Sequence, residues 1–207
     1  MIAKSRQTIM VSSTVYGIEE LLDRIYDLLT SFGFEVWMSH KGTLPVSSKR
    51  TAYENCLAAV EMCDLFLGLI TTHYGSGLDP DSGLSITHLE IRRAIELKKP
   101  RWLLAHENVP FAWSLLKNLR RADQPIPRQE LTVRKSPLMD HLRVLDLYEE
   151  AIINALPVPD RQGNWVQRFR STQDGLTFVT AQFSRYLEVE RFIHENFEER
   201  SSTHEGN

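Results

Sequence analysis

The chain is 207 residues long, which allows one domain with an extension or two very small domains and excludes a large multidomain machine. Its residues are 42% apolar and 25% charged, as in soluble globular proteins, so folding needs neither a metal nor a disulfide. The formal net charge of -3 provides no long-range attraction for nucleic acid or for an anionic membrane, so we expect no membrane and no specific nucleic acid as partners.

The first forty residues alternate strand and helix signals. Residues 8–12 form a short apolar run that predicts a strand, and residues 34–38 predict a second one. Between them, apolar residues recur at offsets that keep to one face of a helix, which Gly33 then ends as a C-terminal cap. The apolar residues of that face are Ile18, Leu21, Leu22, Ile25, Leu28, Leu29 and Phe32.

Two further strands are predicted before residue 106. A loop over 39–49 and a helix over 51–62 precede residues 64–70, which are apolar on both alternating faces, as in a central parallel strand covered by helices on both sides. A loop over 71–85, a helix over 87–97 and a strand over 101–105 follow. This alternation predicts an α/β fold with a flavodoxin-like parallel sheet of order 2-1-3-4, to which a fifth strand could add.

The alternation weakens after residue 106, where helices are predicted near 110–121, 137–155 and 174–198. We therefore divide the chain into an α/β domain over 1–135, a helical extension packed on it over 136–200, and a disordered polar tail over 201–207. Large apolar residues of the extension either cover one face of the sheet or form a homo-oligomer contact; they are Trp165, Phe169, Leu176, Val179 and Phe183.

Cys56 and Cys63 match neither a zinc ligand set nor a disulfide framework, so we expect two reduced core thiols. His40, His88 and His106 are not spaced as ligands, and we expect no metal site and no cofactor. No signal-peptide pattern opens the chain, and no apolar run reaches the about 18 residues of a membrane span, which favours a cytoplasmic location.

A parallel sheet of this order binds ligands beyond the carboxyl ends of its strands, where the winding reverses between the first and third strands. The first loop there carries three hydroxyl side chains, Ser12, Ser13 and Thr14, next to a helix N-terminus that could hold a phosphate or ribose. The alternative is ordinary helix capping by Ser13 or Thr14. The chain has neither the glycine pattern of dinucleotide-binding dehydrogenases after the first strand nor the P-loop of nucleotide hydrolases.

The second loop spans 15 residues, Thr71 to Ser85, and leads to a glutamate at the start of the next helix. Near a helix N-terminus the carboxylate of Glu90 should be stabilised in its ionised form, which suits a nucleophile or a stabiliser of a sugar cation. Alternatively, Thr87 and Glu90 form a capping box. His88 either acts as an acid beside Glu90 or is a solvent-exposed residue of the first turn.

Four blocks of the sequence resemble an uncharacterised "SST" domain family found with STAND/NACHT-type NTPases and bacterial defence proteins. The resemblance covers roughly residues 7–106. The blocks are Val11-Ser12-Ser13-Thr14, Cys63-Asp64, Tyr74-Gly75-Ser76, and Ser85-Ile86-Thr87-His88-Leu89-Glu90 with Ala94 and Lys99-Pro100 downstream. That family is similar in turn to TIR domains and nucleoside 2-deoxyribosyltransferases, which share a flavodoxin-like sheet.

The resemblance implies that Glu90 acts on the N-glycosidic bond of a nucleoside or of NAD, without a metal. Tyr16 would match, with an offset, a tyrosine of the deoxyribosyltransferases, and Asp79 or Asp81 would loosely match an aspartate. His73 stands where many relatives have an arginine. The acidic residue that relatives usually have between the second strand and the following helix is missing after Met38. The implied ligand-binding residues are Ser12, Ser13, Thr14, Tyr16, Tyr74, Gly75, Ser85 and His88.

Two functions of different classes follow from these patterns. In the first, the protein is a nucleoside or nucleotide N-glycosidase or ribosyltransferase that depends on Glu90, with a role in bacterial defence signalling. In the second, it is a non-catalytic sensor of a nucleotide signal, or a self-associating adaptor like many TIR domains. The expected partners are a nucleotide or nucleoside, a second copy of the chain, or an NTPase.

Overall fold

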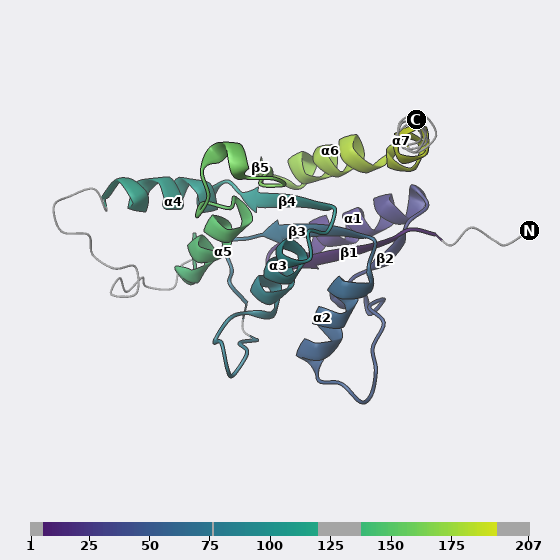
Figure 1. Ribbon diagram of the computed structural model, residues 1–207, viewed down its shortest axis with the longest axis horizontal. Coiled ribbons are helices and arrows are strands. Elements are labelled where there is room, and N and C mark those ends of the chain that lie inside the picture. The colour runs from purple at the N-terminus through teal and green to yellow at the C-terminus, as the bar shows by residue number, and fades with distance from the viewer. Residues whose placement is uncertain (1–5, 76, 120–137, 194–207) are drawn as a thin grey trace, which may run out of the picture.

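Five parallel strands form a single sheet in the order β2-β1-β3-β4-β5, as seen in the computed structural model of the chain (Figure 1). The structure describes residues 6–75, 77–119 and 138–193. The strands are β1 (Thr8–Ser13), β2 (Glu35–Trp37), β3 (Leu65–Ile70), β4 (Arg101–His106) and β5 (Val166–Phe169). The α/β class, the flavodoxin-like sheet and the predicted order of the first four strands are thereby confirmed.

Helices cover both faces of the sheet (Figure 1). One face packs against α1 and α6, and the other packs against α2, α3, α4 and α5. The helices are α1 (Glu19–Ser31), α2 (Ala52–Met62), α3 (Ile86–Glu96), α4 (Asn108–Leu119), α5 (Arg143–Ala151), α6 (Thr172–Phe183) and α7 (Tyr186–Ile193), with short 3-10 helices η1 (Ser39–Lys41) and η3 (Val158–Asp160).

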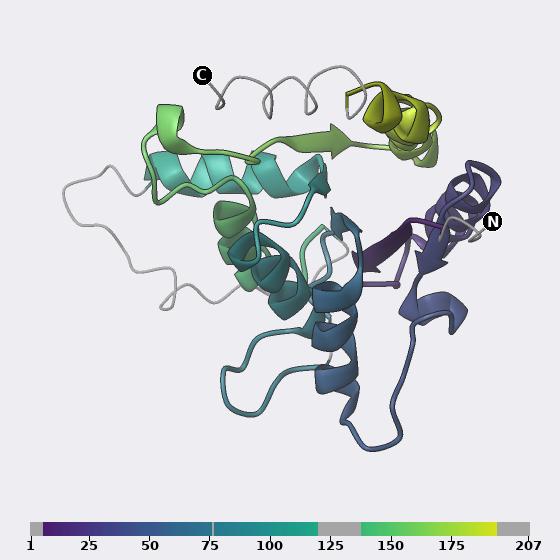
Figure 2. The same cartoon turned by 45° about the vertical axis from the view of Figure 1, so that its right-hand side comes forward.

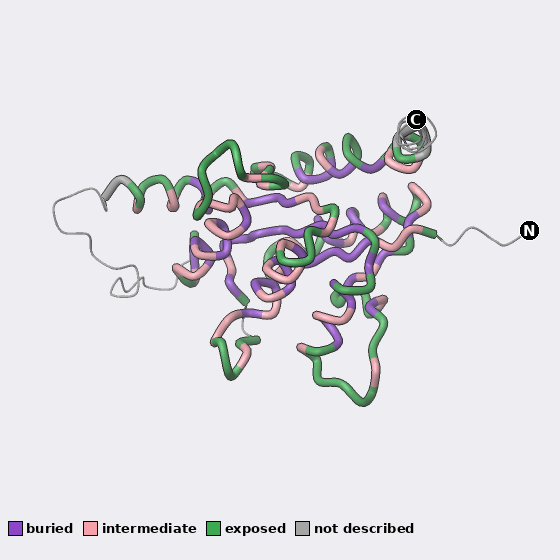
Figure 3. The backbone as a smooth tube through the Cα atoms, viewed as in Figure 1, coloured by how far each residue is buried: buried purple, intermediate pink, exposed green. Residues whose placement is uncertain are grey.

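The two layers arise because successive side chains of a strand point to opposite faces of the sheet. In β1, Ile9 and Val11 belong to the core under α1, whereas Met10 belongs to the core under α2 and α3. All six residues of β3 are buried, as its uniformly apolar sequence predicts. Figure 3 shows this burial running along the middle strands, while the loop after β2 and the tip of the loop after β3 are largely exposed.

The part of the chain expected as a helical extension, 136–200, also provides the fifth strand. Residues Val166 to Phe169 of β5 pair with Leu103 to His106 of β4 in parallel register. The single helix predicted over 174–198 is wrong, because α6 ends at Phe183 and α7 begins at Tyr186. The connector before residue 138 and the tail over 201–207 lie outside the described residues.

Most of the large apolar side chains of this C-terminal part fill the core between the sheet and helices α1 and α6. Phe169, Leu176, Val179 and Phe183 are buried with the side chains of α1, which confirms that they cover one sheet face. Trp165 differs, because 73% of it is exposed. The approach of α6 to α1 is close, since a Cβ added at Gly175 would lie 3.0 Å from a methyl group of Leu21.

Two further expectations from the sequence concern the cysteines and membrane-spanning helices. Cys56 and Cys63 are both free and buried, as predicted. Among the residues that the structure describes, no helix has the length and apolar character needed to cross a bilayer.

Candidate functional site

The carboxyl ends of β1 and β3 meet at the point where the sheet changes winding direction. Ser12 and Ser13 pair with Gly68 and Leu69 in parallel register, so the loop after β1 lies beside the loop after β3. The loops after β2 and β3 both project from the sheet on the side of α2 and α3 (Figure 2). The residues expected to bind a ligand are therefore gathered at one edge of the sheet.

Glu90 reaches this edge from the first half of α3, and the structure pairs it with Ser12. The Ser12 hydroxyl donates a hydrogen bond of 2.5 Å to Glu90 Oε2. Both side chains are buried, with 2% of Ser12 and 5% of Glu90 exposed. The Cys56 thiol of α2 is a second hydrogen-bonding partner of the carboxyl group.

Burial raises the pKa of Glu90 from its ordinary 4.5 to about 7, although the hydrogen bonds from Ser12 and Cys56 lower it in part. The expectation of a carboxylate kept ionised by the helix N-terminus is therefore wrong, because the loss of hydration outweighs the helix dipole. The same burial, together with the proximity of Glu90, raises the pKa of Cys56 to about 12. Glu90 is consequently a group that gains or loses a proton near neutral pH.

The alternative capping roles are also wrong at both loops. Helix α3 is capped by Ser85, whose hydroxyl accepts from the His88 amide, while Thr87 lies inside the helix. Helix α1 begins after Ile18, which makes no side-chain capping bond, and the Ser13 hydroxyl donates to the Thr14 carbonyl. Among Ser13, Thr14, Ser85 and Thr87, only Ser85 serves as a helix cap.

The loop after β3 is fixed to the loop after β1 by side-chain hydroxyl groups. Thr14 Oγ1 lies 2.5 Å from Thr71 Oγ1 and donates to the His73 carbonyl. Gly75 has a φ of 94°, and a Cβ at this position would lie 3.1 Å from Thr14 Cγ2. Glycine is therefore required at this close approach, which gives the Tyr74-Gly75 block a structural reason.

A chain of polar side chains, buried at Tyr74 and His88 and half-buried at Arg92 and Glu150, runs from the loop after β3 through α3 to α5. The Tyr74 hydroxyl lies 2.7 Å from His88 Nδ1, and His88 Nε2 lies 3.2 Å from Glu150 Oε1. Arg92 then donates to both carboxylate oxygens of Glu150, at 2.9 Å and 2.6 Å. His88 is completely buried, so its prediction as a solvent-exposed residue is wrong, and its partners are Tyr74 and Glu150 rather than Glu90.

The protonation of this chain follows from its carboxylate. Burial alone would raise the pKa of Glu150, but hydrogen bonds from His88 and Arg92 outweigh it and bring the pKa to about 2. An ionised Glu150 favours the tautomer of His88 with its proton on Nε2, in which Nδ1 accepts from the Tyr74 hydroxyl. Burial also raises the pKa of Tyr74, which therefore stays a neutral donor.

A pocket of about 460 Å³ opens beside Tyr74, between the loop after β3 and the start of α5. We call it the edge pocket; it is lined by Tyr74, Gly75, Leu78, Gly83, Asp140, His141 and Arg143. The His141 ring stacks on Tyr74 with a centroid distance of 5.4 Å, and Asp140 accepts from the Tyr74 amide. Its size lies within the range of about 300 to 1,000 Å³ for small-molecule sites.

Three polar residues of the edge pocket have no signal in the sequence. Asp140, His141 and Arg143 lie beyond the βα units, in a region that shows only a helical pattern. Arg143 also hydrogen-bonds the Gly83 carbonyl, so the pocket wall ties the start of α5 to the loop after β3. No local motif signals these residues, because only the folded chain brings them to Tyr74.

Other candidate residues lie apart from Glu90 and the edge pocket lining. Tyr16 is 72% exposed and packs its ring edge-on against His73, at 4.8 Å between centroids. Asp79 accepts from the amide and hydroxyl of Ser82 within its own turn, and Asp81 is exposed. Among the described residues there is no group of three or more side chains placed to hold a metal ion.

These features define a flavodoxin-like α/β domain with a buried acidic group and, at the carboxyl edge of its sheet, a pocket lined by both apolar and polar residues. The chain belongs to the family described as Domain of unknown function (DUF4062), whose model matches residues 8–155. No curated protein matches the chain. The family match thus includes Glu90 and the whole edge pocket, and it ends before β5.

Proposed function

We propose that this domain binds a nucleotide or nucleoside in the edge pocket and acts as a sensor of that ligand. The observation that carries the proposal is the chemistry of the lining: stacked aromatic rings, a guanidinium group and a carboxylate converge on one pocket. A base stacks on the exposed face of an aromatic or imidazole ring, a phosphate pairs with arginine, and ribose hydroxyls donate to a carboxylate. His141, Arg143 and Asp140 are the residues in these roles.

The position of Glu90 favours binding over turnover. Cleavage of an N-glycosidic bond requires a carboxyl group within about 3.5 Å of the anomeric carbon. Glu90 is 5% exposed, is hydrogen-bonded to Ser12, and does not line the edge pocket. A ligand in that pocket therefore meets Tyr74 and Arg143 without meeting Glu90.

The test is ligand binding to the full chain by calorimetry and thermal shift, with ATP, ADP, NAD and adenosine as probes. We expect at least one of them to bind, and we expect Arg143→Ala to weaken binding of a phosphate-bearing ligand about tenfold or more. Arg24→Ala, on the exposed surface of α1, is the matched control and should leave affinity unchanged. Absence of binding by all four probes, or equal loss in both variants, would contradict the proposal.

A second candidate is the N-glycosidase or ribosyltransferase activity that the family resemblance implies. It is favoured by one observation, the pKa of about 7 at Glu90, because a carboxyl group that is half protonated at neutral pH can act as an acid or a base. This activity would require an opening beside Ser12. The assay is release of free base from NAD and from a panel of nucleosides, followed by chromatography, and Glu90→Gln should abolish any release.

The biological setting belongs to the same proposal. Resemblance to domains found with STAND/NACHT-type NTPases supports a role in bacterial defence. In this role, ligand binding by the domain changes its interaction with an NTPase partner or with a second copy of the chain. Light scattering with and without the bound nucleotide tests the second arrangement, since a rise in mass on binding is expected for a self-associating sensor.

A further inference from the structure

Hydrogen bonds at both ends of Tyr74 hold this residue in the wall of the edge pocket. Its backbone amide donates to Asp140 Oδ1 at 2.9 Å, and its hydroxyl lies 2.7 Å from His88 Nδ1. The hydroxyl oxygen has two further hydrogen-bonding partners, the Ser85 amide at 3.4 Å and the Arg143 side chain. Because Tyr74 is also 97% buried, with 3% exposed, its ring is fixed at one place in the wall.

The ring of Tyr74 supports the imidazole of His141. The two rings stack at 5.4 Å between centroids, with an interplanar angle of 26°. Nδ1 of His141 accepts from the Arg143 amide at 3.0 Å, which ties the imidazole to the start of α5. His141 is exposed, so a base that stacks on its open face is supported by Tyr74 through the imidazole. Affinity for such a base therefore depends on where the Tyr74 ring lies.

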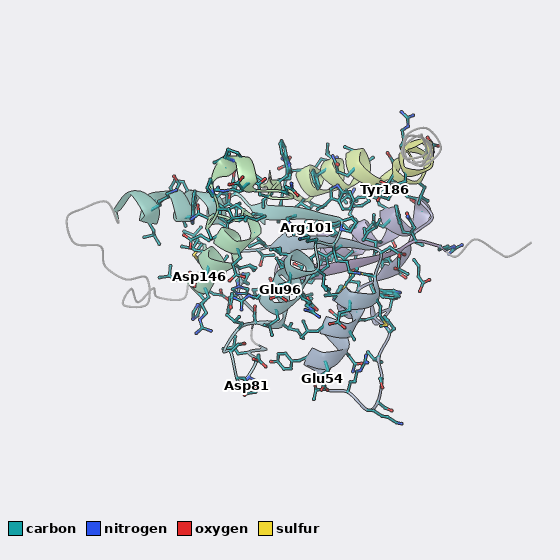
Figure 4. The ribbon with its side chains drawn as sticks, viewed as in Figure 1. Glu54, Asp81, Glu96, Arg101, Asp146 and Tyr186 are labelled. Carbon is teal, nitrogen blue, oxygen red and sulfur yellow. The ribbon has the colours of Figure 1, made fainter. Side chains whose placement is uncertain are left out.

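His88 connects the hydroxyl of Tyr74 to a carboxylate on another helix. The imidazole is completely buried, and its Nε2 lies 3.2 Å from Glu150 Oε1. Figure 4 labels Glu96 on α3 and Asp146 on α5, the two helices that this contact joins. A buried ring with a partner at each nitrogen cannot turn without leaving a polar atom unpaired, so the imidazole limits the movement of the hydroxyl.

Glu150 is held in place by Arg92 of α3. The guanidinium donates to both carboxylate oxygens, at 2.9 Å and 2.6 Å, and a two-bond pair of this kind fixes the plane of the carboxylate. The oxygen that faces His88 is one of these two, so the carboxylate has donors at both oxygens. An amide at this position would offer one acceptor oxygen and would turn its NH2 group toward a donor.

We propose that His88 and Glu150 are positioning residues of the edge pocket, which hold Tyr74 where His141 stacks on it. Neither residue lines the edge pocket, so both act through Tyr74 rather than on the ligand. The assignment rests on the proposed function, because it concerns the pocket in which a nucleotide or nucleoside binds. It gives His88, which the resemblance implies as a ligand-binding residue, a role behind the pocket wall.

The first measurement needs no ligand. Side-chain nitrogen NMR of the full chain at neutral pH reports which nitrogen of His88 carries a proton, and we expect Nδ1 to carry none, since it accepts from the Tyr74 hydroxyl. Glu150→Gln should shift the ring signals of His141, because the support of the Tyr74 ring is altered. Glu149→Gln is the matched control on the same helix; its carboxylate accepts from Trp113 Nε1, and it should leave the His141 signals in place.

The second measurement is a double-mutant cycle on affinity. Calorimetry with ATP, ADP, NAD and adenosine compares wild type, Glu150→Gln, Tyr74→Phe and the double variant. Tyr74→Phe keeps the ring but removes the hydroxyl through which Glu150 acts. We expect each single change to weaken binding about threefold or more, and the double variant to bind about as well as the weaker single variant, because both changes break the same connection. Glu149→Gln should change affinity by less than about twofold.

Three outcomes would overturn the proposal. The first is a proton on Nδ1 of His88, because the Tyr74 hydroxyl would then not donate to it. The second is an equal response of the His141 signals to Glu150→Gln and Glu149→Gln. The third is additive loss of affinity in the double variant, which would indicate independent effects. Failure of all four probes to bind contradicts the proposed function, and the NMR comparison then decides by itself whether His88 and Glu150 position Tyr74.

Discussion

Replacing Glu90 by glutamine tests the electrostatics of the buried carboxyl group directly. The amide has the same shape, cannot ionise, and can still accept the hydrogen bond that Ser12 donates. Below pH 4.5 both proteins carry a neutral group at this position, so their stabilities should be similar there. Any difference that grows with pH reports the cost of ionising Glu90 in the folded protein.

The size of the effect follows from the shift in pKa. Glu90 titrates at 4.5 under ordinary conditions and at about 7 in the folded protein. Between these values the folded protein keeps a proton that the unfolded chain has released, so the free energy of unfolding falls as pH rises. The full contribution, present below 4.5 and lost as pH rises through 7, is about 3 kcal/mol at about 1.4 kcal/mol per pH unit.

The assay is urea unfolding of wild type and Glu90→Gln at a series of pH values, followed by tryptophan fluorescence and far-UV circular dichroism. Taking the difference between the two proteins removes the contribution of every other titrating group. We expect wild type to lose about 2 to 3 kcal/mol relative to Glu90→Gln between about pH 4.5 and 8. Glu20→Gln, at an exposed carboxylate, should show a flat difference.

A flat difference between wild type and Glu90→Gln would refute the reasoning, because it would mean that the carboxyl group is hydrated and titrates at its ordinary value. A difference that rises with pH in favour of wild type would refute it as well, since that sign requires a stabilised carboxylate.

The remaining predictions concern the core, the ion pair of Glu150, the fifth strand and the cap of α2. Gly68→Ala should destabilise the protein by about 1 to 3 kcal/mol in urea unfolding, because the new Cβ would lie 2.7 Å from a methyl group of Leu103. Glu150→Gln should cost about 1 to 2 kcal/mol at neutral pH, discounted for partial exposure, and this difference should vanish as pH falls from 4.5 through 2. A chain ending at residue 155 should aggregate in size-exclusion chromatography, because removing β5 exposes the paired edge of β4. Thr51→Ala should lower the stability of α2 by about 1 kcal/mol through loss of its capping box, seen as a lower melting temperature.

Much of the sheet could be predicted because its strands are short apolar runs separated by clear turns. β3 was identified from a run that is apolar on both faces, and it is buried at every residue. β5 was not located, because four residues reading Val-Gln-Arg-Phe carry no apolar alternation of their own. Its place is decided by pairing with β4, a long-range interaction that no local pattern reports.

The site was predicted less completely, for a physical reason. The sequence indicated that Ser12 and Glu90 belong to one edge of the sheet, and the structure joins them by a hydrogen bond. It could not indicate that Glu90 is sealed from solvent, because burial depends on α2 and its Cys56. It also gave no sign that His88 turns toward Glu150, which is 62 residues further along the chain.

Hydrogen-bonded side chains connect Tyr74, His88 and Glu150, and they run from one hollow of the domain to another. Tyr74 lines the edge pocket, Glu150 lines a second hollow between α3 and α5, and the fully buried imidazole of His88 lies between these two residues. A ligand that displaced the Tyr74 hydroxyl would leave Nδ1 of the buried His88 without its hydrogen-bond partner, at a cost of about 1 to 3 kcal/mol. A ligand bound on one side of α3 would thereby change the affinity for a ligand on the other side. By reciprocity, the second ligand would change the affinity for the first by the same factor.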